Sequence, residues 1–144
     1  MSAELPNDLH ERIKALSAEG DVLAEQGRHR DAIARYDDAW KLIPDPKLDW
    51  EASTWVLAAL GDSFFFEKQW DGVCKALEYA VHCPGGFGNP FIHLRLGQAK
   101  LELGEEVQAA DELMRAYMGG GAEIFASDDA KYLAFLKTRA NIDA

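Results

Sequence analysis

A glycine followed by three apolar residues at fixed offsets recurs three times along the chain. The offsets carry first a small or β-branched residue, then a large apolar residue and then alanine. A repeat of this length indicates an array of similar supersecondary units, each of which buries its apolar face against the next unit. The three sets are Gly20 with Ala32, Tyr36 and Ala39; Gly61 with Val73, Leu77 and Ala80; and Gly97 with Ala109, Leu113 and Ala116.

The spacing within each set fits two antiparallel helices that approach closely at one point. The glycines lie in the first helix of each pair, where a side chain would push the second helix away. We expect Ala32, Val73 and Ala109 to face those glycines from the second helix. The large residue and the alanine then follow along the same buried stripe.

Start and stop signals divide the chain into three helical hairpins and one further helix. The hairpins cover residues 8–44, 49–84 and 89–121, and the last helix covers residues 128–140 and caps the open end of the array. We predict Asp49, Asn89 and Ser127 as N-caps, with Pro90 at a first helical position. The predicted helices run from about Asn7 to Gln26, Arg30 to Leu42, Trp50 to Glu67, Trp70 to His82, Asn89 to Leu103, Glu105 to Met118 and Asp128 to Ala140.

The first hairpin resembles the tetratricopeptide repeat family, whose period is about 34 residues. The other two hairpins are degenerate, and Lys68 stands where Gly27 and Gly104 stand in their own repeats. The resemblance covers about Ile13 to Gly121 and implies an all-α fold in a single domain, residues 1–144. In that fold three helix-turn-helix repeats stack as a short right-handed α-solenoid with a C-terminal capping helix. The matching positions are Gly20, Leu23, Gly27, Ala32, Tyr36, Ala39 and Pro44.

The resemblance also implies a concave groove, lined by the first helix of each pair, that holds a peptide or a partner helix. Aromatic and Arg side chains dominate the energetics of protein interfaces, so we expect them to anchor the partner. The alternative is that individual aromatic residues of this set pack beneath a neighbouring helix. The predicted partner-binding residues are Trp55, Asp62, Phe65, Phe66, Phe91, Arg95, Gln98 and Glu102.

One ligand of the family can be compared with the sequence position by position. Co-chaperones that resemble this chain clamp the terminal carboxylate of heat-shock proteins with basic and Asn side chains. The matching positions here hold Ser17, Asp21, Ala59, Phe91 and Arg95. Only Arg95 suits a carboxylate, so we do not expect that ligand.

The charge of the chain narrows the class of partner. The 144 residues include 25 Asp and Glu against 15 Lys and Arg, which gives a net charge of -10. Nucleic acid is a poor partner for such a chain, and a basic protein surface is a better one. The alternative is that the acidity serves solubility. No apolar stretch approaches the roughly 20 residues of a membrane-spanning helix and no secretion signal begins the chain, so we expect no membrane partner and a cytoplasmic location.

Catalytic and metal-binding patterns are absent from the sequence. His82, Cys83 and His93 lack the spacing of a zinc motif, and we expect His93 to be a hydrogen-bonded residue of the core or its rim. Cys74 and Cys83 are too few for a disulfide framework and are expected to be reduced. The sequence therefore predicts no enzyme, no metal and no cofactor.

A small, acidic interaction module suits the neutralisation of one dedicated partner. Our leading hypothesis is an immunity protein that binds a cognate bacterial toxin domain through the concave groove. The alternative is a chaperone or adaptor for a secreted or assembled protein. A homodimer joined through Trp50, Trp55 and Phe87 is a third hypothesis.

Overall fold

The computed structural model describes residues 5–142, and within that range every regular element is helical. Helices α1 (Asn7–Glu25), α2 (His29–Leu42), α3 (Glu51–Phe66) and α4 (Trp70–Ala80) belong to a first compact unit, Met1–Phe87, called unit 1. Helices α5 (Pro90–Glu102), α6 (Glu106–Gly120) and α7 (Lys131–Arg139) belong to a second, Gly88–Ala144, called unit 2. None of the described helices is both long enough and apolar enough to cross a membrane. The predicted all-α class is confirmed, whereas the single domain stays a prediction.

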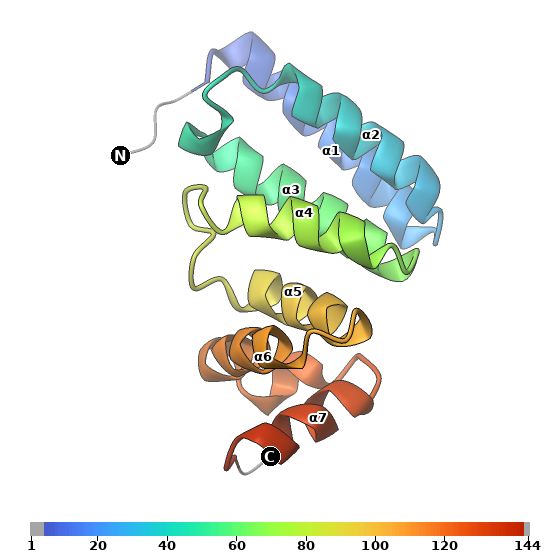
Figure 1. The fold of residues 1–144 in the computed structure, drawn as a ribbon. Coiled ribbons are helices and arrows are strands. Elements are labelled where there is room, and N and C mark those ends of the chain that lie inside the picture. The colour runs from blue at the N-terminus through green and yellow to red at the C-terminus, as the bar shows by residue number, and fades with distance from the viewer. Residues whose placement is uncertain (1–4, 143–144) are drawn as a thin grey trace. The chain divides into compact units, whose positions relative to one another are not determined.

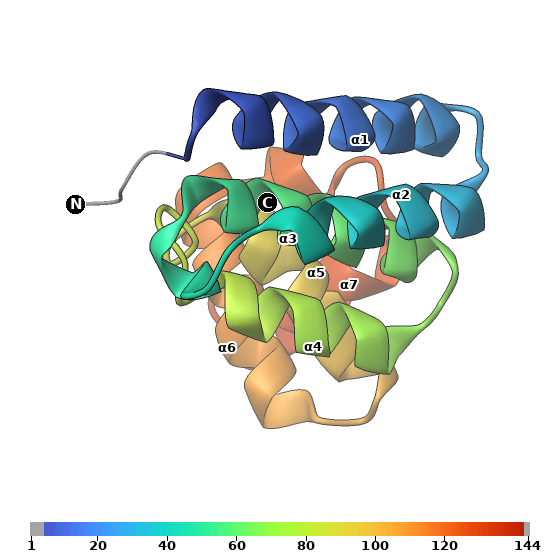
Figure 2. The same cartoon turned by 90° about the horizontal axis from the view of Figure 1, so that it is seen from above.

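Unit 1 consists of two antiparallel hairpins, α1 with α2 and α3 with α4 (Figure 1). Helix α2 packs against α3, and α1 also contacts α3. The α1–α2 and α3–α4 turns lie at the same end of unit 1, as Figure 2 shows from above. Apolar residues of three helices hold the hairpins together. The buried cluster consists of Ile13, Ala39, Ile43, Ala52 and Val56.

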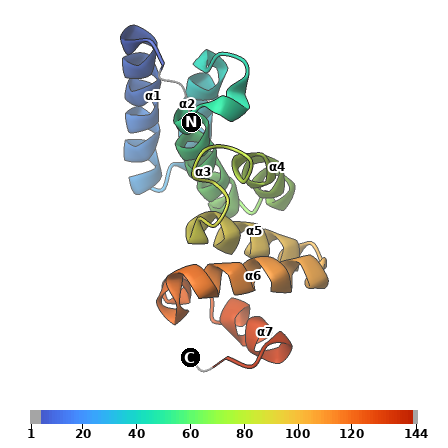
Figure 3. The ribbon, with the colours of Figure 1, turned by 90° about the vertical axis from the view of Figure 1, so that its left-hand side faces the viewer.

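Unit 2 contains the third hairpin, formed by α5 and α6, and the C-terminal helix α7 (Figure 3). A short 3-10 helix, η2 (Ala122–Phe125), follows α6 and contacts both α5 and α6. Phe125, Tyr132 and Leu136 are buried, so the segment after α6 packs through its apolar side chains. The predicted capping helix is therefore present and covers part of the third hairpin.

The repeat glycines sit at close helix contacts, but against a different residue from the one predicted. A Cβ built on Gly20 would lie 2.5 Å from the ring of Tyr36, and one on Gly61 would lie 2.5 Å from Leu77. The corresponding contact of Gly97 is with Leu113 at 2.7 Å. The atoms nearest to each glycine thus belong to the large residue, not to Ala32, Val73 or Ala109. The physical reason is that a large side chain fills the space that the missing Cβ leaves.

Two of the three predicted N-caps are wrong. Asp49 ends a 3-10 turn, η1 (Lys47–Asp49), and α3 begins at Glu51 without a side-chain cap. Ser127 precedes a helix that begins only at Lys131, whose backbone N–H donates to Asp129 Oδ1 at 2.9 Å. Asn89 is confirmed, since its side chain accepts hydrogen bonds from the backbone of two residues in the first turn of α5.

Helix ends differ from the prediction by a few residues in two further places. Helix α4 ends at Ala80 instead of His82, and α6 continues through Gly119 and Gly120 instead of ending at Met118. Helix α6 stops where Gly121 takes a positive φ of 69°. The glycines inside α6 are tolerated because packing and hydrogen bonds outweigh their modest helix penalty.

The hairpin turns share one backbone conformation. Gly27 and Gly104 have positive φ angles of 78° and 80°, and Lys68 takes a φ of 58° at the equivalent position. A residue with a Cβ is strained in this left-handed region, which glycine enters freely. The structure therefore shows that the second hairpin keeps the turn of the repeat despite the loss of its glycine.

Candidate partner-binding surface

The predicted binding residues are divided equally between the two units. Those on α3 belong to unit 1 and those on α5 belong to unit 2, so each group is described within its own unit. The binding role of all eight stays a prediction, and the structure shows what each side chain contacts. The residues of α3 are Trp55, Asp62, Phe65 and Phe66, and the residues of α5 are Phe91, Arg95, Gln98 and Glu102.

Three carboxylates of unit 1 raise the pKa of one buried tyrosine hydroxyl group. Tyr36 on α2 donates a hydrogen bond from its hydroxyl to Asp21 Oδ1 on α1 at 2.6 Å. Burial raises the pKa of Tyr36 above its ordinary value, and the hydrogen bond to Asp21 and the charges of Asp21, Asp62 and Glu25 raise it further. We call Asp21, Glu25 and Asp62 the acidic face of unit 1. Its side chains come from α1 and α3, the first helix of each hairpin.

An aromatic cluster lies beside the two turns of unit 1 and consists of His29, Phe65, Phe66 and Trp70. The rings of His29 and Phe66 stack at a centroid distance of 4.8 Å and an angle of 16°. Phe65 meets the edge of Phe66 at 5.5 Å and that of Trp70 at 5.6 Å. Phe66 remains 49% exposed. The cluster joins α2, α3 and α4 and still presents one aromatic ring to a partner.

Trp55 on α3 packs within unit 1. It is half-buried and packs against the core cluster of unit 1. Its ring also meets the edge of His10 at 6.4 Å. This aromatic residue therefore fits the alternative considered above, in which part of the set packs against a neighbouring helix.

In unit 2 the predicted groove residues are engaged by the chain itself. Asp128 Oδ2 accepts hydrogen bonds from Arg95 Nη1 at 3.0 Å and from Gln98 Nε2 at 2.9 Å. Gln98 is fully buried, and the side chains of Arg95 and Asp128 are only 16% and 9% exposed. Gln98 therefore offers no exposed atoms to a partner in this structure.

Glu102 is held in the same way, one turn further along α5. Its carboxylate accepts a hydrogen bond from the Tyr132 hydroxyl at 2.9 Å and pairs with the Lys131 ammonium. Burial alone would raise the pKa of Glu102, but the hydrogen bonds from Lys131 and Tyr132 bring the net shift below the ordinary value. We call these contacts, together with those of Asp128, the C-terminal latch.

The sequence pattern did not predict the latch, because the two segments that form it, α5 and residues 128–132, are far apart along the chain. Asp128 and Arg95 are separated by 33 positions, and no local periodicity connects them. Charge complementarity was the one sequence signal that could have predicted this contact, since α5 carries Arg95 and the segment before α7 carries Asp128.

Phe91 differs from the other predicted residues of α5, because its side chain is 68% exposed at the start of the helix.

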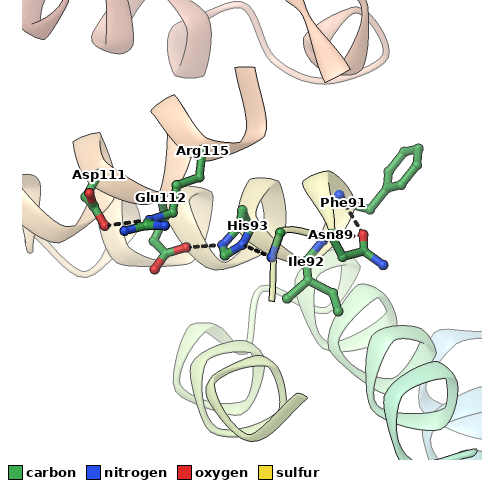
Figure 4. A network of polar contacts seen from close by, with 8 residues as sticks. Asn89, Phe91, Ile92, His93, Asp111, Glu112 and Arg115 are labelled. Carbon is green, nitrogen blue, oxygen red and sulfur yellow. Dashed lines mark hydrogen bonds and ion pairs between the residues drawn. The ribbon is translucent and has the colours of Figure 1, made fainter. Parts of the chain in front are cut away.

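His93 has the geometry of a structural histidine (Figure 4). Its Nδ1 lies 2.6 Å from Glu112 Oε2, and the backbone N–H of Gly88 donates to its Nε2 at 3.0 Å. Because Nε2 accepts that hydrogen bond, Nδ1 carries the proton and donates to Glu112. Both ring nitrogens are thus used, and the residue is 2% exposed. The expectation of a hydrogen-bonded core histidine is confirmed.

Metal ligands do not gather in the part of the chain that the structure describes. Within residues 5–142 no group of three or more His, Cys, Asp or Glu side chains is placed to hold a metal ion. Cys74 and Cys83 are both buried. Burial raises the pKa of the Cys83 thiol, so it stays protonated.

Comparison with known proteins identifies the architecture of these hairpins. The first TPR domain of Spaghetti (RPAP3), bound to the HSP90 peptide SRMEEVD, superposes with a TM-score of 0.67 over 89% of this chain and 90% of its own, at 16% identity. The C-terminal TPR-containing domain of a putative FK506-binding protein of Plasmodium falciparum gives 0.74 over 96% and 92%, at 12% identity. The fold is tetratricopeptide-like. The predicted fold of helix-turn-helix repeats is confirmed.

Sequence comparison with this tetratricopeptide-like chain reaches less far. No family model matches the sequence. A stretch of 60 residues, 42% of the chain, is 37% identical to tetratricopeptide repeat protein 33 of Danio rerio. This stretch covers 22% of that protein, so the tetratricopeptide-like chain matches only a small part of the relative's length.

Proposed function

We propose that this protein is a non-enzymatic binding module that neutralises a toxin domain, in the manner of an immunity protein. The observation that carries the proposal is the acidic face of unit 1 beside an aromatic cluster with an exposed ring. Such a surface combines charge, which accelerates encounter with a basic partner, and an aromatic anchor, which contributes binding energy. We place this function in the cytoplasm.

The polar network of unit 2 supports a non-enzymatic role. His93 is oriented by Glu112, as a general base would be, but its other nitrogen accepts the hydrogen bond from Gly88. A general base needs a free nitrogen within reach of the substrate proton. We therefore assign His93 to the stability of unit 2.

A ligand like the HSP90 peptide of the Spaghetti domain is not the one we propose. Asp21 places a carboxylate in unit 1, where a carboxylate ligand would be repelled. In unit 2 Arg95 already pairs with Asp128 at 3.0 Å. Both observations favour a basic ligand over an acidic peptide.

A chaperone or adaptor for a secreted or assembled protein is the second candidate function. The observation that favours it is Phe66, whose exposed ring could hold an apolar side chain of a segment that has not yet folded. The two candidates differ in the state of the bound partner. An immunity protein holds a folded toxin domain, whereas a chaperone releases its client when the client folds.

Affinity purification of the tagged protein from its own host tests the proposal. The test variant carries Glu25→Gln, Asp62→Asn and Phe66→Ala. The control carries Glu19→Gln, Glu123→Gln and Val107→Ala, which remove the same charges and an exposed apolar side chain elsewhere. The control changes lie at exposed positions, and Glu19 precedes Asp21 by two residues and so points away from it.

We expect one protein to co-purify with the parent and with the control, and to be lost with the test variant. If that protein is toxic alone and harmless in the complex, the immunity function stands. A client that is bound only before it folds supports the chaperone function instead. Recovery of this chain alone, with a doubled native mass, contradicts both and supports the homodimer.

A further inference from the structure

We infer that the contact between His93 and the backbone of Gly88 is an acid-sensitive switch at the start of unit 2. While His93 is neutral, its Nε2 accepts a hydrogen bond from the Gly88 amide and holds this residue against α5. Protonation of Nε2 removes the acceptor and releases the amide. The inference concerns a different part of the molecule from the proposed binding surface and does not rest on the proposed function.

The two ring nitrogens of His93 have opposite roles in this contact. Nδ1 lies 2.6 Å from Glu112 Oε2 on α6, and Nε2 lies 3.0 Å from the backbone nitrogen of Gly88 (Figure 4). A backbone N–H can only donate, so Nε2 is unprotonated as long as this hydrogen bond exists. A proton on Nε2 would place two N–H donors face to face, and the contact is lost in that state.

Burial of the ring makes the loss of this acceptor a structural event. His93 is 2% exposed, so solvent cannot simply take over the hydrogen bond of a protonated Nε2. Gly88 is the partner with room to move, because a Cβ built on it would meet no heavy atom of the described residues within 4 Å. We therefore expect the Gly88 backbone to separate from the ring, while the ring keeps its place in the core.

Two charges act in opposite directions on the protonation of His93. The Glu112 carboxylate favours the imidazolium, because it carries the opposite charge within hydrogen-bond distance of Nδ1. The N-terminus of α5 lies one turn away and disfavours the imidazolium through its partial positive charge. Removal of the Glu112 charge should therefore make His93 harder to protonate.

Glu112 is the charged group of unit 2 that His93 contacts directly. The other charged groups on the elements packed against His93, and on α5 close to it, either form ion pairs of their own or are exposed. They are Asp111 with Arg115 on α6 at 3.1 Å, Arg95 of α5 with Asp128 at 3.0 Å, and the exposed Glu123 of η2.

The released residue lies at the boundary between the two compact units. Unit 1 ends at Phe87, whose side chain is 69% exposed, and unit 2 begins at Gly88. Earlier in the same connection, the Gly86 amide donates to the Cys83 carbonyl at 3.0 Å, and a carbonyl does not titrate in this pH range. Acid should therefore loosen the connection at Gly88 and change the setting of Phe87, while Gly86 keeps its hydrogen bond.

Nuclear magnetic resonance of the full chain labelled with ¹⁵N tests the inference between about pH 8 and about pH 4.5, the range in which histidines titrate. At the upper end we expect a through-bond coupling between the Gly88 amide nitrogen and His93 Nε2. This coupling should vanish as the Nε2 signal shows protonation. The protection of the Gly88 amide against hydrogen exchange, relative to an unstructured amide at the same pH, should fall about tenfold per pH unit below the transition. The Gly86 amide is the internal control and should keep its protection.

Two variants separate a switch from a merely structural contact. Glu112→Gln keeps an acceptor for Nδ1 but removes the charge, so the transition should move to lower pH by about one unit or more. Glu123→Gln removes an exposed charge of the same unit and should leave the transition in place. His93→Gln offers Gly88 an acceptor oxygen that does not titrate, and the Gly88 protection of this variant should no longer depend on pH.

Three results would overturn the inference. The first is a coupling and a Gly88 protection that persist after Nε2 is protonated or down to the lowest pH. The second is an equal transition in Glu112→Gln and Glu123→Gln. The third is a loss of Gly86 protection or of helical circular dichroism in step with Gly88, because acid would then unfold the protein instead of releasing one contact.

Discussion

The hydroxyl of Tyr36 donates a 2.6 Å hydrogen bond to Asp21, and the ring of Tyr36 lies against Gly20, the residue before that aspartate. One side chain of α2 thus fills the space that a missing Cβ leaves on α1 and also satisfies a carboxylate at the edge of the same contact. The repeat pattern and the acidic face therefore meet at this residue.

Tyrosine titration should show the effect of these surroundings. Burial, hydrogen bonding and nearby carboxylates raise the pKa of Tyr36 and of Tyr132. Because these folded pKa values exceed that of an unfolded tyrosine, about 10, the stabilisation is complete below pH 10 and is lost as the pH rises through the folded values. In ultraviolet difference spectra we expect Tyr36→Phe and Tyr132→Phe each to remove one late-titrating group. A late phase of unchanged amplitude in either variant would contradict the assignment.

The C-terminal latch should be sensitive to acid at Glu102. Its folded pKa lies below that of an unfolded glutamate, about 4.3, so its contribution to stability is present above that pH and is lost as the pH falls through the folded value. We expect Glu102→Gln to flatten the decline of stability in this acid range, as measured by urea unfolding at successive pH values. An exposed acidic control, Glu123→Gln, should leave the decline unchanged. If the stability of Glu102→Gln and that of the parent decline in parallel as the pH falls, Glu102 does not contribute to the acid sensitivity of the protein.

Asp128 should contribute more to the free energy of unfolding than an exposed carboxylate does, because it pairs with the largely buried Arg95. Asp128→Ala leaves Arg95 and Gln98 without their shared acceptor. We expect a loss of roughly 2–4 kcal/mol in the free energy of unfolding. Asp128→Asn, which keeps an acceptor oxygen for Gln98, should lose less. Chemical denaturation of both variants measures the order, and equal losses would show that charge is the whole effect.

Replacement of Lys68 by glycine should stabilise the protein. It takes a φ of 58°, whereas Gly27 and Gly104 occupy the same position of the other hairpins. Lys68→Gly removes the strain of a Cβ in the left-handed region, and we expect a gain of about 0.5–1 kcal/mol. The reverse change, Gly27→Ala, should lose about 1 kcal/mol. Urea denaturation checks both signs, and a loss of stability in Lys68→Gly would mean that its side chain makes a compensating contact.

The repeat, the helix class and most helix ends were predictable because their signals are local. Asn89 and Pro90 start α5 as expected, since a cap acts on the turn that follows it. Asp49 and Ser127 were wrong as caps because many residues of that type lie near helix starts, and the surrounding packing selects which of them takes the role.

The three helical hairpins could be predicted from the order of the residues, because helical periodicity and the glycine contacts recur at fixed spacing. Which polar residues remain available to a partner could not be predicted in this way, because it depends on contacts between distant segments of the folded chain. Arg95, Gln98 and Glu102 read as groove residues, but the segment after α6 folds back and satisfies them with Asp128, Tyr132 and Lys131. The physical reason is that a buried charge needs a partner, and the identity of that partner depends on which distant segments meet in space.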